Sequence, residues 1–214
     1  MFTAKKIVFF DCDGVLTIDN SSWLILHEYF KSFDNSYFAK LYAEDKISYL
    51  DWMKIDIALM INSWKAPIHR KDIEKALDTI KLRDEVFFIG KLLKQRGYLL
   101  AVVSSGVDYV VKKVCSVLGA DICLYNELVY DENGYVIPGG KAWVPLKEKP
   151  FLIEKIVRGL GLDMKDVVYV GDSKWDIPVF KKVGLSIAVK PCDEACDYAD
   201  YVIENLVEIL DLLK

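Results

Sequence analysis

The sequence predicts an α/β protein in which a Rossmann-like parallel sheet is covered by helices on both faces. Short, continuously apolar runs alternate with amphipathic segments, as is typical of strands buried on both faces and joined by helices. Polar residues directly follow three of these apolar runs, which indicates functional strand ends. A long block of helical periodicity after the first strand predicts an inserted α-helical cap.

Composition places the 214-residue chain among globular proteins with one core and a modest inserted lobe. It is 53% hydrophobic and 28% charged, with a net charge of −4. Because basic and acidic residues are interspersed, we expect no nucleic-acid partner. No apolar run is long enough for a signal peptide or a membrane span, so we expect a cytoplasmic protein without a membrane partner.

The five cysteines form no regular framework, and Cys192 and Cys196 are expected to be ordinary reduced thiols. Cys192 and Cys196 have C-x3-C spacing, but no second Cys or His pair lies nearby to complete a zinc site. Since the chain has only two histidines, His27 and His69, a zinc site based on histidine is not expected either.

The N-terminal third contains one strand and the helical block. In "KKIVFFDCDGVLT", a buried strand over 7–10 runs into Asp11 and Asp13, and Gly14 permits the turn after them. Residues 18–82 carry aromatic and aliphatic residues at helical spacing and no strand signal. The sequence therefore predicts a cap over 18–82 and a core made of 1–17 and 83–214.

From residue 83 onward, helices and strands alternate. Gly97 and Gly119 are expected to end two helices, and Pro150 to begin a third. Asn133–Gly134 lies between two β-prone runs and predicts a hairpin. Strands are expected in "YLLAVVSSG", where Ser-Ser-Gly stops the strand, and in "DVVYVGDS", "LSIAV" and "ADYVI", before a closing helix from about residue 206.

Four polar clusters are candidates for one site at the carboxyl edge of the sheet. Asp11 and Asp13 end the first strand, Ser104-Ser105-Gly106 ends the second, and Asp172 with Asp176 follows a third. The fourth cluster, "LKEKP", precedes a helix and offers Lys147 and Lys149.

These residue types together favour phosphoryl transfer. Clustered carboxylates repel one another unless a cation lies among them, and all-oxygen ligands favour Mg²⁺. Hydroxyl and backbone N–H groups of a Ser-Ser-Gly segment before a helix suit an anion, and a lysine suits phosphate. Without a suitable histidine or cysteine pattern, a carboxylate is the candidate nucleophile that attacks phosphorus.

The ordered motifs resemble those of the haloacid dehalogenase (HAD) superfamily. "DCDGVLT" resembles the first motif, "VVSSG" the second, "KEKP" the third and "GDSKWD" the fourth. The arrangement is closest to the phosphoserine phosphatase-like branch, in which a helical cap of the C1 type is inserted between the first two motifs. This resemblance covers nearly the whole chain and implies an Mg²⁺-dependent phosphatase.

The resemblance also implies a role for each matching residue. Asp11 would be the nucleophile that becomes an aspartyl phosphate, and Asp13 the general acid and base. Mg²⁺ would bind the carboxylates of Asp11 and Asp172 and the backbone carbonyl of Asp13. The remaining roles are phosphate binding by Ser104, Ser105 and Gly106, charge stabilisation by Lys149 in preference to Lys147, and support of the metal or lysine by Asp176.

Three positions depart from the branch. Where phosphoserine phosphatases have a glutamate and a cap arginine that recognise the amino-acid part, this chain has Asn20 and Asp56. An aspartate cannot bind a substrate carboxylate, so phosphoserine is not the expected substrate, although Lys54 could replace the arginine under a shifted alignment. Trp175 replaces the asparagine that is frequent in the fourth motif.

The leading hypothesis is therefore a phosphomonoesterase acting on a small phosphorylated metabolite, as a monomer or homodimer. A phosphosugar mutase of the same superfamily is the first alternative, because it would share the first motif and a cap. A phospho-accepting signalling receiver and a catalytically inactive binding protein are alternatives of another class. Receivers are shorter and lack a cap, and the intact set of site residues disfavours an inactive protein. Asp13 favours a phosphate ester, since an alkoxide leaving group needs a proton.

Overall fold

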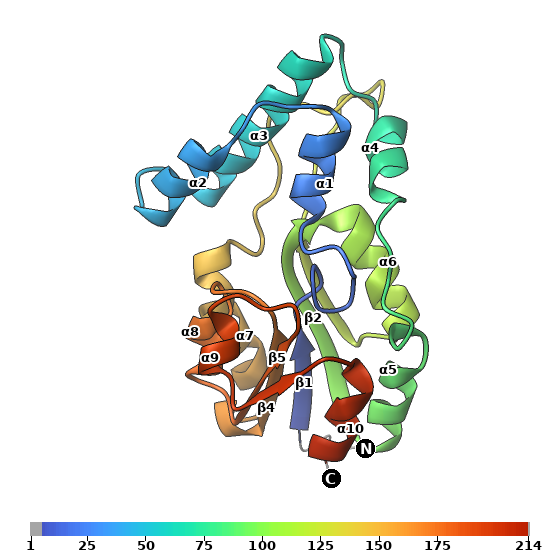
Figure 1. The fold of residues 1–214 in the computed structure, drawn as a ribbon, viewed down its shortest axis with the longest axis vertical. Helices are drawn as coiled ribbons and strands as arrows, with labels where there is room; N and C mark the ends of the chain where they lie inside the picture. The colour runs from blue at the N-terminus through green and yellow to red at the C-terminus, as the bar shows by residue number, and fades with distance from the viewer. Residues whose placement is uncertain (1–5, 214) are drawn as a thin grey trace.

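The computed structural model describes residues 6–213, which form a six-stranded parallel sheet. The strand order is β3-β2-β1-β4-β5-β6, so that β1 lies between β2 and β4 (Figure 1). The strands are β1 (Lys6–Phe10), β2 (Tyr98–Val107), β3 (Ile122–Asn126), β4 (Val167–Gly171), β5 (Leu185–Val189) and β6 (Tyr201–Ile203).

Helices cover both faces of this sheet, as predicted. Side chains along β1 alternate between the faces: Val8 and Phe10 belong to one buried cluster, Ile7 and Phe9 to the other. The first face is covered by α5 (Val86–Gln95), α6 (Asp108–Leu118) and α10 (Ile209–Leu212). The second is covered by α7 (Lys149–Gly159), α8 (Ile177–Phe180) and α9 (Ala195–Tyr198). Short 3₁₀ helices lie at Leu146–Glu148, Met164–Asp166 and Leu206–Glu208.

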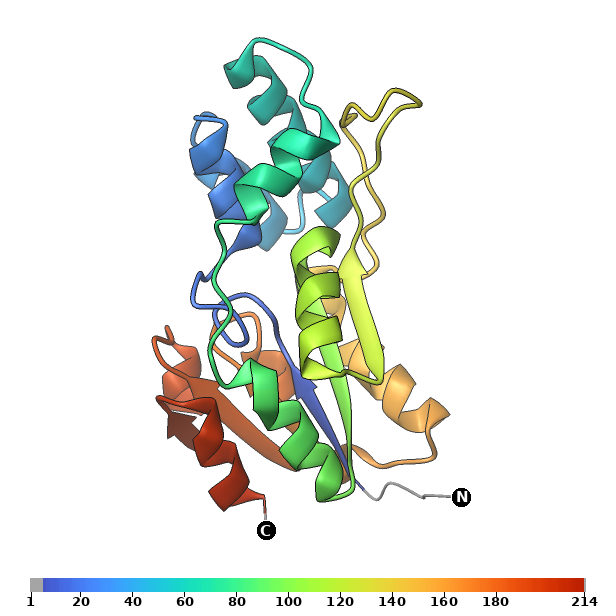
Figure 2. The same cartoon turned by 90° about the vertical axis from the view of Figure 1, so that its right-hand side faces the viewer.

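Four further helices stand beyond the carboxyl ends of the strands and form the predicted cap (Figures 1 and 2). They are α1 (Ser22–Tyr29), α2 (Ser36–Ala43), α3 (Tyr49–Trp64) and α4 (Arg70–Leu77). Leu26, Phe30, Ile57 and Met60 bury the apolar faces of α1 and α3 in the same cluster as the sheet. The limits of the cap at 18 and 82 stay a prediction.

Residues 127–144 also reach the cap, although the sequence assigned them to the core (Figure 2). The predicted hairpin turn is present, because Gly134 has φ +85° and Tyr130 pairs with Val136 in an antiparallel bridge. The backbone N–H of Arg70 donates to the Gly134 carbonyl at 2.9 Å, and its guanidinium lies 4.3 Å from the centroid of the Tyr130 ring. This hairpin therefore packs against α4.

The helices of this protein are short. The longest in the described part of the chain, α3, has 16 residues, whereas a bilayer span needs about 20 apolar residues. Accordingly, no helix within 6–213 has the length and apolar character to cross a bilayer.

The second strand is longer than predicted. Ser104, Ser105 and Gly106 do not stop it as a turn but form its last part, because β2 continues to Val107. The pairing with β3 shifts register after Val103 and resumes where Val107 pairs with Asn126. The polar segment is thus held as irregular strand rather than as a loop.

The prediction that Cys192 and Cys196 are reduced thiols is wrong. Disulfides join Cys115 to Cys123, with Cα atoms 6.3 Å apart, and Cys192 to Cys196, with Cα atoms 5.6 Å apart. Cys12 is free and buried. The first pair arises because α6 packs on β3, a proximity that the cysteine spacing does not reveal.

Candidate active site

Asp11 lies where β1 ends and is fixed there from several sides. Its N–H donates to the Val170 carbonyl of β4 at 2.9 Å. One carboxylate oxygen accepts from the Cys12 N–H and the other from Lys149 Nζ, both at 2.7 Å. Burial raises the pKa of Asp11 to about 6, against the opposing effect of Lys149. The carboxyl is therefore ionised at neutral pH, as a nucleophile must be.

Lys149 is completely buried and joins Asp11 to Asp176. Its Nζ lies 2.8 Å from Oδ1 of Asp176, which also accepts from the Tyr169 hydroxyl at 2.7 Å. Burial alone would lower the pKa of Lys149, but the two carboxylates raise it above its ordinary value. The ammonium group thus stays charged next to the reacting carboxylate.

Of the two candidate lysines, only Lys149 reaches this site. The Nζ of Lys147 instead lies 2.9 Å from the carbonyl of Ala43, the last residue of α2, and 2.5 Å from Oδ1 of Asp45, two residues later. The two lysines point in different directions because Lys149 begins α7, whereas Lys147 belongs to the preceding 3₁₀ turn.

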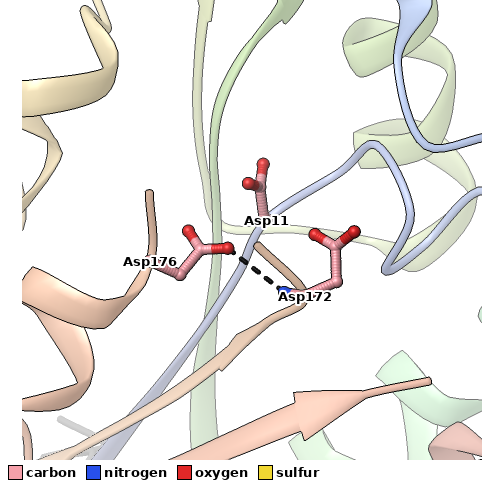
Figure 3. A group of neighbouring side chains, drawn as sticks. All are labelled: Asp11, Asp172 and Asp176. Carbon is pink, nitrogen blue, oxygen red and sulfur yellow. Dashed lines mark hydrogen bonds between the residues drawn. The ribbon is translucent and has the colours of Figure 1, made fainter. Parts of the chain in front are cut away.

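Asp11, Asp172 and Asp176 form an acidic group whose oxygen atoms lie within 4.8 Å of one another (Figure 3). Asp176 is already saturated: besides Lys149 and Tyr169, it accepts from the N–H groups of Asp172 at 3.1 Å and Ser173 at 3.2 Å. Asp172, in contrast, receives no side-chain hydrogen bond from residues 6–213, so its carboxylate is available as a ligand.

The donor set around Asp172 fits Mg²⁺. Burial and the neighbouring carboxylates of Asp11 and Asp176 raise the pKa of Asp172 to about 9, and a cation bound among these carboxylates would lower it. Gly14 has φ +75°, and a Cβ there would overlap the Asp172 carboxylate, so the first motif packs directly against it. All these donors are oxygen atoms, which hard divalent cations prefer.

Asp13 is held by Ser22, the first residue of the cap helix α1. Its Oδ2 accepts from the Ser22 N–H at 2.8 Å and the Ser22 hydroxyl at 2.7 Å, while Oδ1 is buried without a partner among the described residues. Burial raises the pKa of Asp13, and the Ser22 hydrogen bonds counteract this in part. A raised pKa suits a general acid. Ser22 was not predicted from the sequence.

The Ser104–Gly106 segment lies beside Asp13. Ser104 is 1% exposed, and its Oγ accepts from the Gly106 N–H at 3.1 Å. A Cβ on Gly106 would lie 2.8 Å from Oδ2 of Asp13, so only glycine allows this approach. The Ser105 hydroxyl donates to the Val144 carbonyl at 2.7 Å, so this side chain is already engaged within the protein.

The carbonyl of Ser105 connects the cap to the sheet edge. It accepts from Trp23 Nε1 at 3.2 Å, the Tyr49 hydroxyl at 2.9 Å and Asn126 Nδ2 at 3.0 Å. Trp23 and Tyr49 belong to α1 and α3, so two cap helices contact the same backbone atom. No local signal in the sequence indicates these contacts.

A cavity of about 460 Å³ brings the predicted residues together between the cap and the sheet. Its walls include Asp11, Asp13, Ser104–Gly106 and Asp172, together with both predicted substrate contacts, Asn20 and Asp56. Among the cap aromatics, Trp23, Tyr49 and Trp52 line this cavity. Tyr29 and Trp64 instead stack on each other, with ring centroids 6.1 Å apart.

The family model for haloacid dehalogenase-like hydrolases matches residues 5–184. This chain belongs to that family. Phosphoserine phosphatase of Methanocaldococcus jannaschii is 32% identical over an alignment of 214 positions that covers 98% of each chain. A phosphoserine phosphatase of Archaeoglobus fulgidus is 34% identical over 145 residues, covering 66% of this chain but 42% of the relative. The predicted resemblance to the phosphoserine phosphatase-like branch is confirmed.

Solved structures of this HAD branch share the fold. A substrate-bound phosphoserine phosphatase complex superposes with a TM-score of 0.79 at 28% identity, covering 98% of this chain and 99% of that one. A phospho-aspartyl intermediate analogue of phosphoserine phosphatase gives the same TM-score at 29% identity and the same coverage. The protein is therefore a HAD phosphatase with the predicted fold class.

The three departures from the branch pattern all lie on the cavity of this HAD enzyme. Asn20 is exposed at its edge, Asp56 is buried in its wall, and Trp175 lines it from the loop before α8. None of them contacts Asp11 or Asp172 through a hydrogen bond. The departures thus concern the part of the cavity beyond the carboxylates.

Proposed function

We propose that this HAD phosphatase is an Mg²⁺-dependent phosphomonoesterase that hydrolyses a small phosphorylated metabolite through an aspartyl phosphate on Asp11. The observation that carries this proposal is the position of Asp11 and Asp13 on one cavity wall, with Lys149 holding the first and Ser22 the second. In this proposal the core, 1–17 and 83–214, performs the chemistry, and the cap, 18–82, selects the substrate.

In the first step, a carboxylate oxygen of Asp11 attacks phosphorus, and the bond to the ester oxygen breaks. Asp13 donates its proton to that oxygen, so the leaving group departs as an alcohol. The buried charge of Lys149 stabilises negative charge that passes from Asp11 to the phosphoryl oxygens. In this proposal Ser104 and the N–H groups of Ser105 and Gly106 bind the same phosphoryl group, and the Gly106 N–H exchanges its hydrogen bond to Ser104 Oγ for one to phosphate.

In the second step, water attacks phosphorus of the aspartyl phosphate, and Asp13, now ionised, accepts a proton from this water. The bond between phosphorus and Asp11 breaks, which releases inorganic phosphate and regenerates the carboxylate. Throughout both steps, Asp176 keeps Lys149 in position.

Mg²⁺ would be held by the carboxylates of Asp11 and Asp172 and the Asp13 carbonyl. When bound, this ion neutralises charge on the phosphoryl oxygens and on the two carboxylates. The raised pKa of Asp172 and its lack of hydrogen-bond donors within 6–213 support this ligand set.

The first test is phosphate release from a generic aryl phosphate, with Mg²⁺ and with a chelator, by wild-type protein and Asp11→Asn. We expect Mg²⁺-dependent turnover, a burst of aryl alcohol ahead of phosphate when the second step is slower, and loss of both in Asp11→Asn. Turnover that survives Asp11→Asn would contradict the aspartyl-phosphate route. A mutase would instead return an isomer that retains its phosphate, so product analysis separates that alternative.

A further inference from the structure

The end of the cavity formed by the cap is acidic and aromatic. No Lys, Arg or His within residues 6–213 lines the cavity. Three of its five carboxylates, those of Asp11, Asp13 and Asp172, belong to the reaction centre. The side chains left to contact the leaving group include Asp56, Asp193, Trp23, Tyr49, Trp52 and Trp175.

Asp56 is an unusual residue for this place because it is only 4% exposed. Its Oδ1 accepts from Asn35 Nδ2 at 3.0 Å and lies 3.3 Å from His27 Nε2. For its other oxygen, Oδ2, no hydrogen-bond donor lies within 6–213, although Asp56 lines the cavity. On the wall of a cavity, this oxygen is open to a hydrogen-bond donor or a cation on the ligand.

Aromatic rings lie on the same face of α3 as Asp56. Tyr49, Trp52, Met53 and Asp56 are spaced i, i+3, i+4 and i+7, and all four line the cavity. The rings of Tyr49 and Trp52 have centroids 5.9 Å apart at 72°. Tyrosine and tryptophan faces attract cations, and a nearby carboxylate adds to this attraction.

We propose that the leaving group of the substrate carries an ammonium group and no carboxylate, and that this ammonium binds between Asp56 and the rings of Trp52 and Tyr49. The inference rests on the proposed phosphomonoesterase function and specifies its substrate class. A second anionic group on the leaving group would meet Asp56 and Asp193 without a cationic side chain to offset the repulsion. A neutral alcohol would leave the aromatic faces without a specific contact.

Three probes of similar size separate these possibilities. O-phosphoethanolamine carries the ammonium group, 2-hydroxyethyl phosphate replaces it by a neutral hydroxyl, and O-phosphoserine adds a carboxylate. We expect kcat/KM for O-phosphoethanolamine to exceed that for each of the others by about tenfold or more, the value of one charge-assisted contact. Equal values for all three, or a preference for phosphoserine, would overturn the inference.

Two variants with a matched control locate the contact. Asp56→Asn keeps the shape and should reduce kcat/KM for O-phosphoethanolamine about tenfold, with a change of less than about twofold for 2-hydroxyethyl phosphate. Trp52→Leu should raise KM for O-phosphoethanolamine more than KM for 2-hydroxyethyl phosphate. Glu28→Gln removes a charge from the exposed surface of α1 and should leave all three values unchanged. An equal loss for both substrates in Asp56→Asn would contradict the proposed contact.

The aryl phosphate distinguishes failure of this inference from failure of the proposed function. If the aryl phosphate is hydrolysed through Asp11 but the ammonium substrate is not preferred, only the inference fails. If no phosphate ester is hydrolysed, both fail. Calorimetric binding to Asp11→Asn gives an independent readout: O-phosphoethanolamine should bind more tightly than O-phosphoserine, and the reverse order would overturn the inference.

Discussion

Lys149, behind the sheet end of the cavity, and Asp56, at its cap end, differ in how completely they are paired. At the sheet end, Lys149 is fully buried and has two carboxylate partners, and Asp176 accepts from four residues. At the cap end, Asp56 is equally hidden from solvent, but one of its oxygens has no donor among residues 6–213.

This difference suggests separate roles for the two ends within the proposed function. The hydrogen-bond network of Lys149, Asp11 and Asp176 holds these three groups in one arrangement and needs little reorganisation during the reaction. The second carboxylate oxygen of Asp56, on a cavity wall, is open to water or to a donor on a ligand. In the proposed function, the sheet end therefore provides the chemistry and the cap end selects the substrate.

The largest effect is expected from replacing Lys149, the cation that pairs with Asp11 and Asp176. Lys149→Met leaves Asp11 and Asp176 buried without their cation, so the free energy of unfolding should fall by roughly 3–5 kcal/mol. Phosphatase activity should be lost as well. Urea unfolding of the variant and the wild-type protein measures the stability change.

Lys147→Met is the matched control for this comparison. Its partner Asp45 has a side chain that is 82% exposed, so the free energy of unfolding should fall by no more than about 1 kcal/mol. Equal destabilisation by the two substitutions would show that the buried network is not the reason for the effect of Lys149.

An intermediate effect on the free energy of unfolding is expected from Mg²⁺ binding and its dependence on pH. The pKa of Asp172 is about 9 in the folded protein but about 3.9 in an unfolded chain, so the folded state holds this proton more tightly. In metal-free protein the free energy of unfolding should therefore fall as pH rises through this window. Asp11, with its pKa of about 6, acts in the same direction over a narrower range.

Because Mg²⁺ binds the ionised carboxylates, its stabilising effect should grow with pH. At a hundred times its Kd, the ion should add about 2.7 kcal/mol to the free energy of unfolding. Thermal unfolding with Mg²⁺ and with a chelator, at about pH 5.5 and about pH 8.5, measures this gain. Asp172→Asn should remove both the gain and its pH dependence, and a gain that persists in this variant would place the ion elsewhere.

The smallest effect is expected from Ser22, the cap residue that donates a hydrogen bond to Asp13 at the sheet end. Ser22→Ala removes the hydroxyl that donates to Asp13, which should reduce kcat about tenfold, the value of one hydrogen bond to a charged group. Since this hydrogen bond lowers the pKa of Asp13, its loss should move the corresponding limb of the pH–rate profile to higher pH.

Ser21→Ala provides the comparison for Ser22→Ala. Ser21 caps α1 by accepting from the Leu24 N–H at 3.2 Å, and it makes no hydrogen bond to Asp13. Loss of the Ser21 hydroxyl should lower the free energy of unfolding by about 1 kcal/mol and leave the pH–rate profile unchanged. An identical profile shift in both variants would mean that helix α1, rather than the Ser22 hydroxyl, sets the pKa of Asp13.

The sequence by itself determined the strands, the cap helices and the candidate catalytic carboxylates. Apolar runs and helical periodicity are local properties, and Asp11 follows β1 so directly that its place at the sheet edge depends on the strand alone. Parallel strands then bring their carboxyl ends to one edge, which is why Ser104 and Asp172 could be predicted for the same site.

Only the tertiary structure decided which side chains meet across long separations. The contact of Lys149 with Asp11 spans 138 residues, and that of Trp23 with Ser105 spans 82. Three further features likewise depend on packing: Ser22 as the partner of Asp13, the position of Trp23 and Trp52 rather than Tyr29 and Trp64 on the cavity, and both disulfides. Periodicity reports which face of an element is buried, but not which neighbour lies against it, because that neighbour is set by how helices and strands pack in three dimensions.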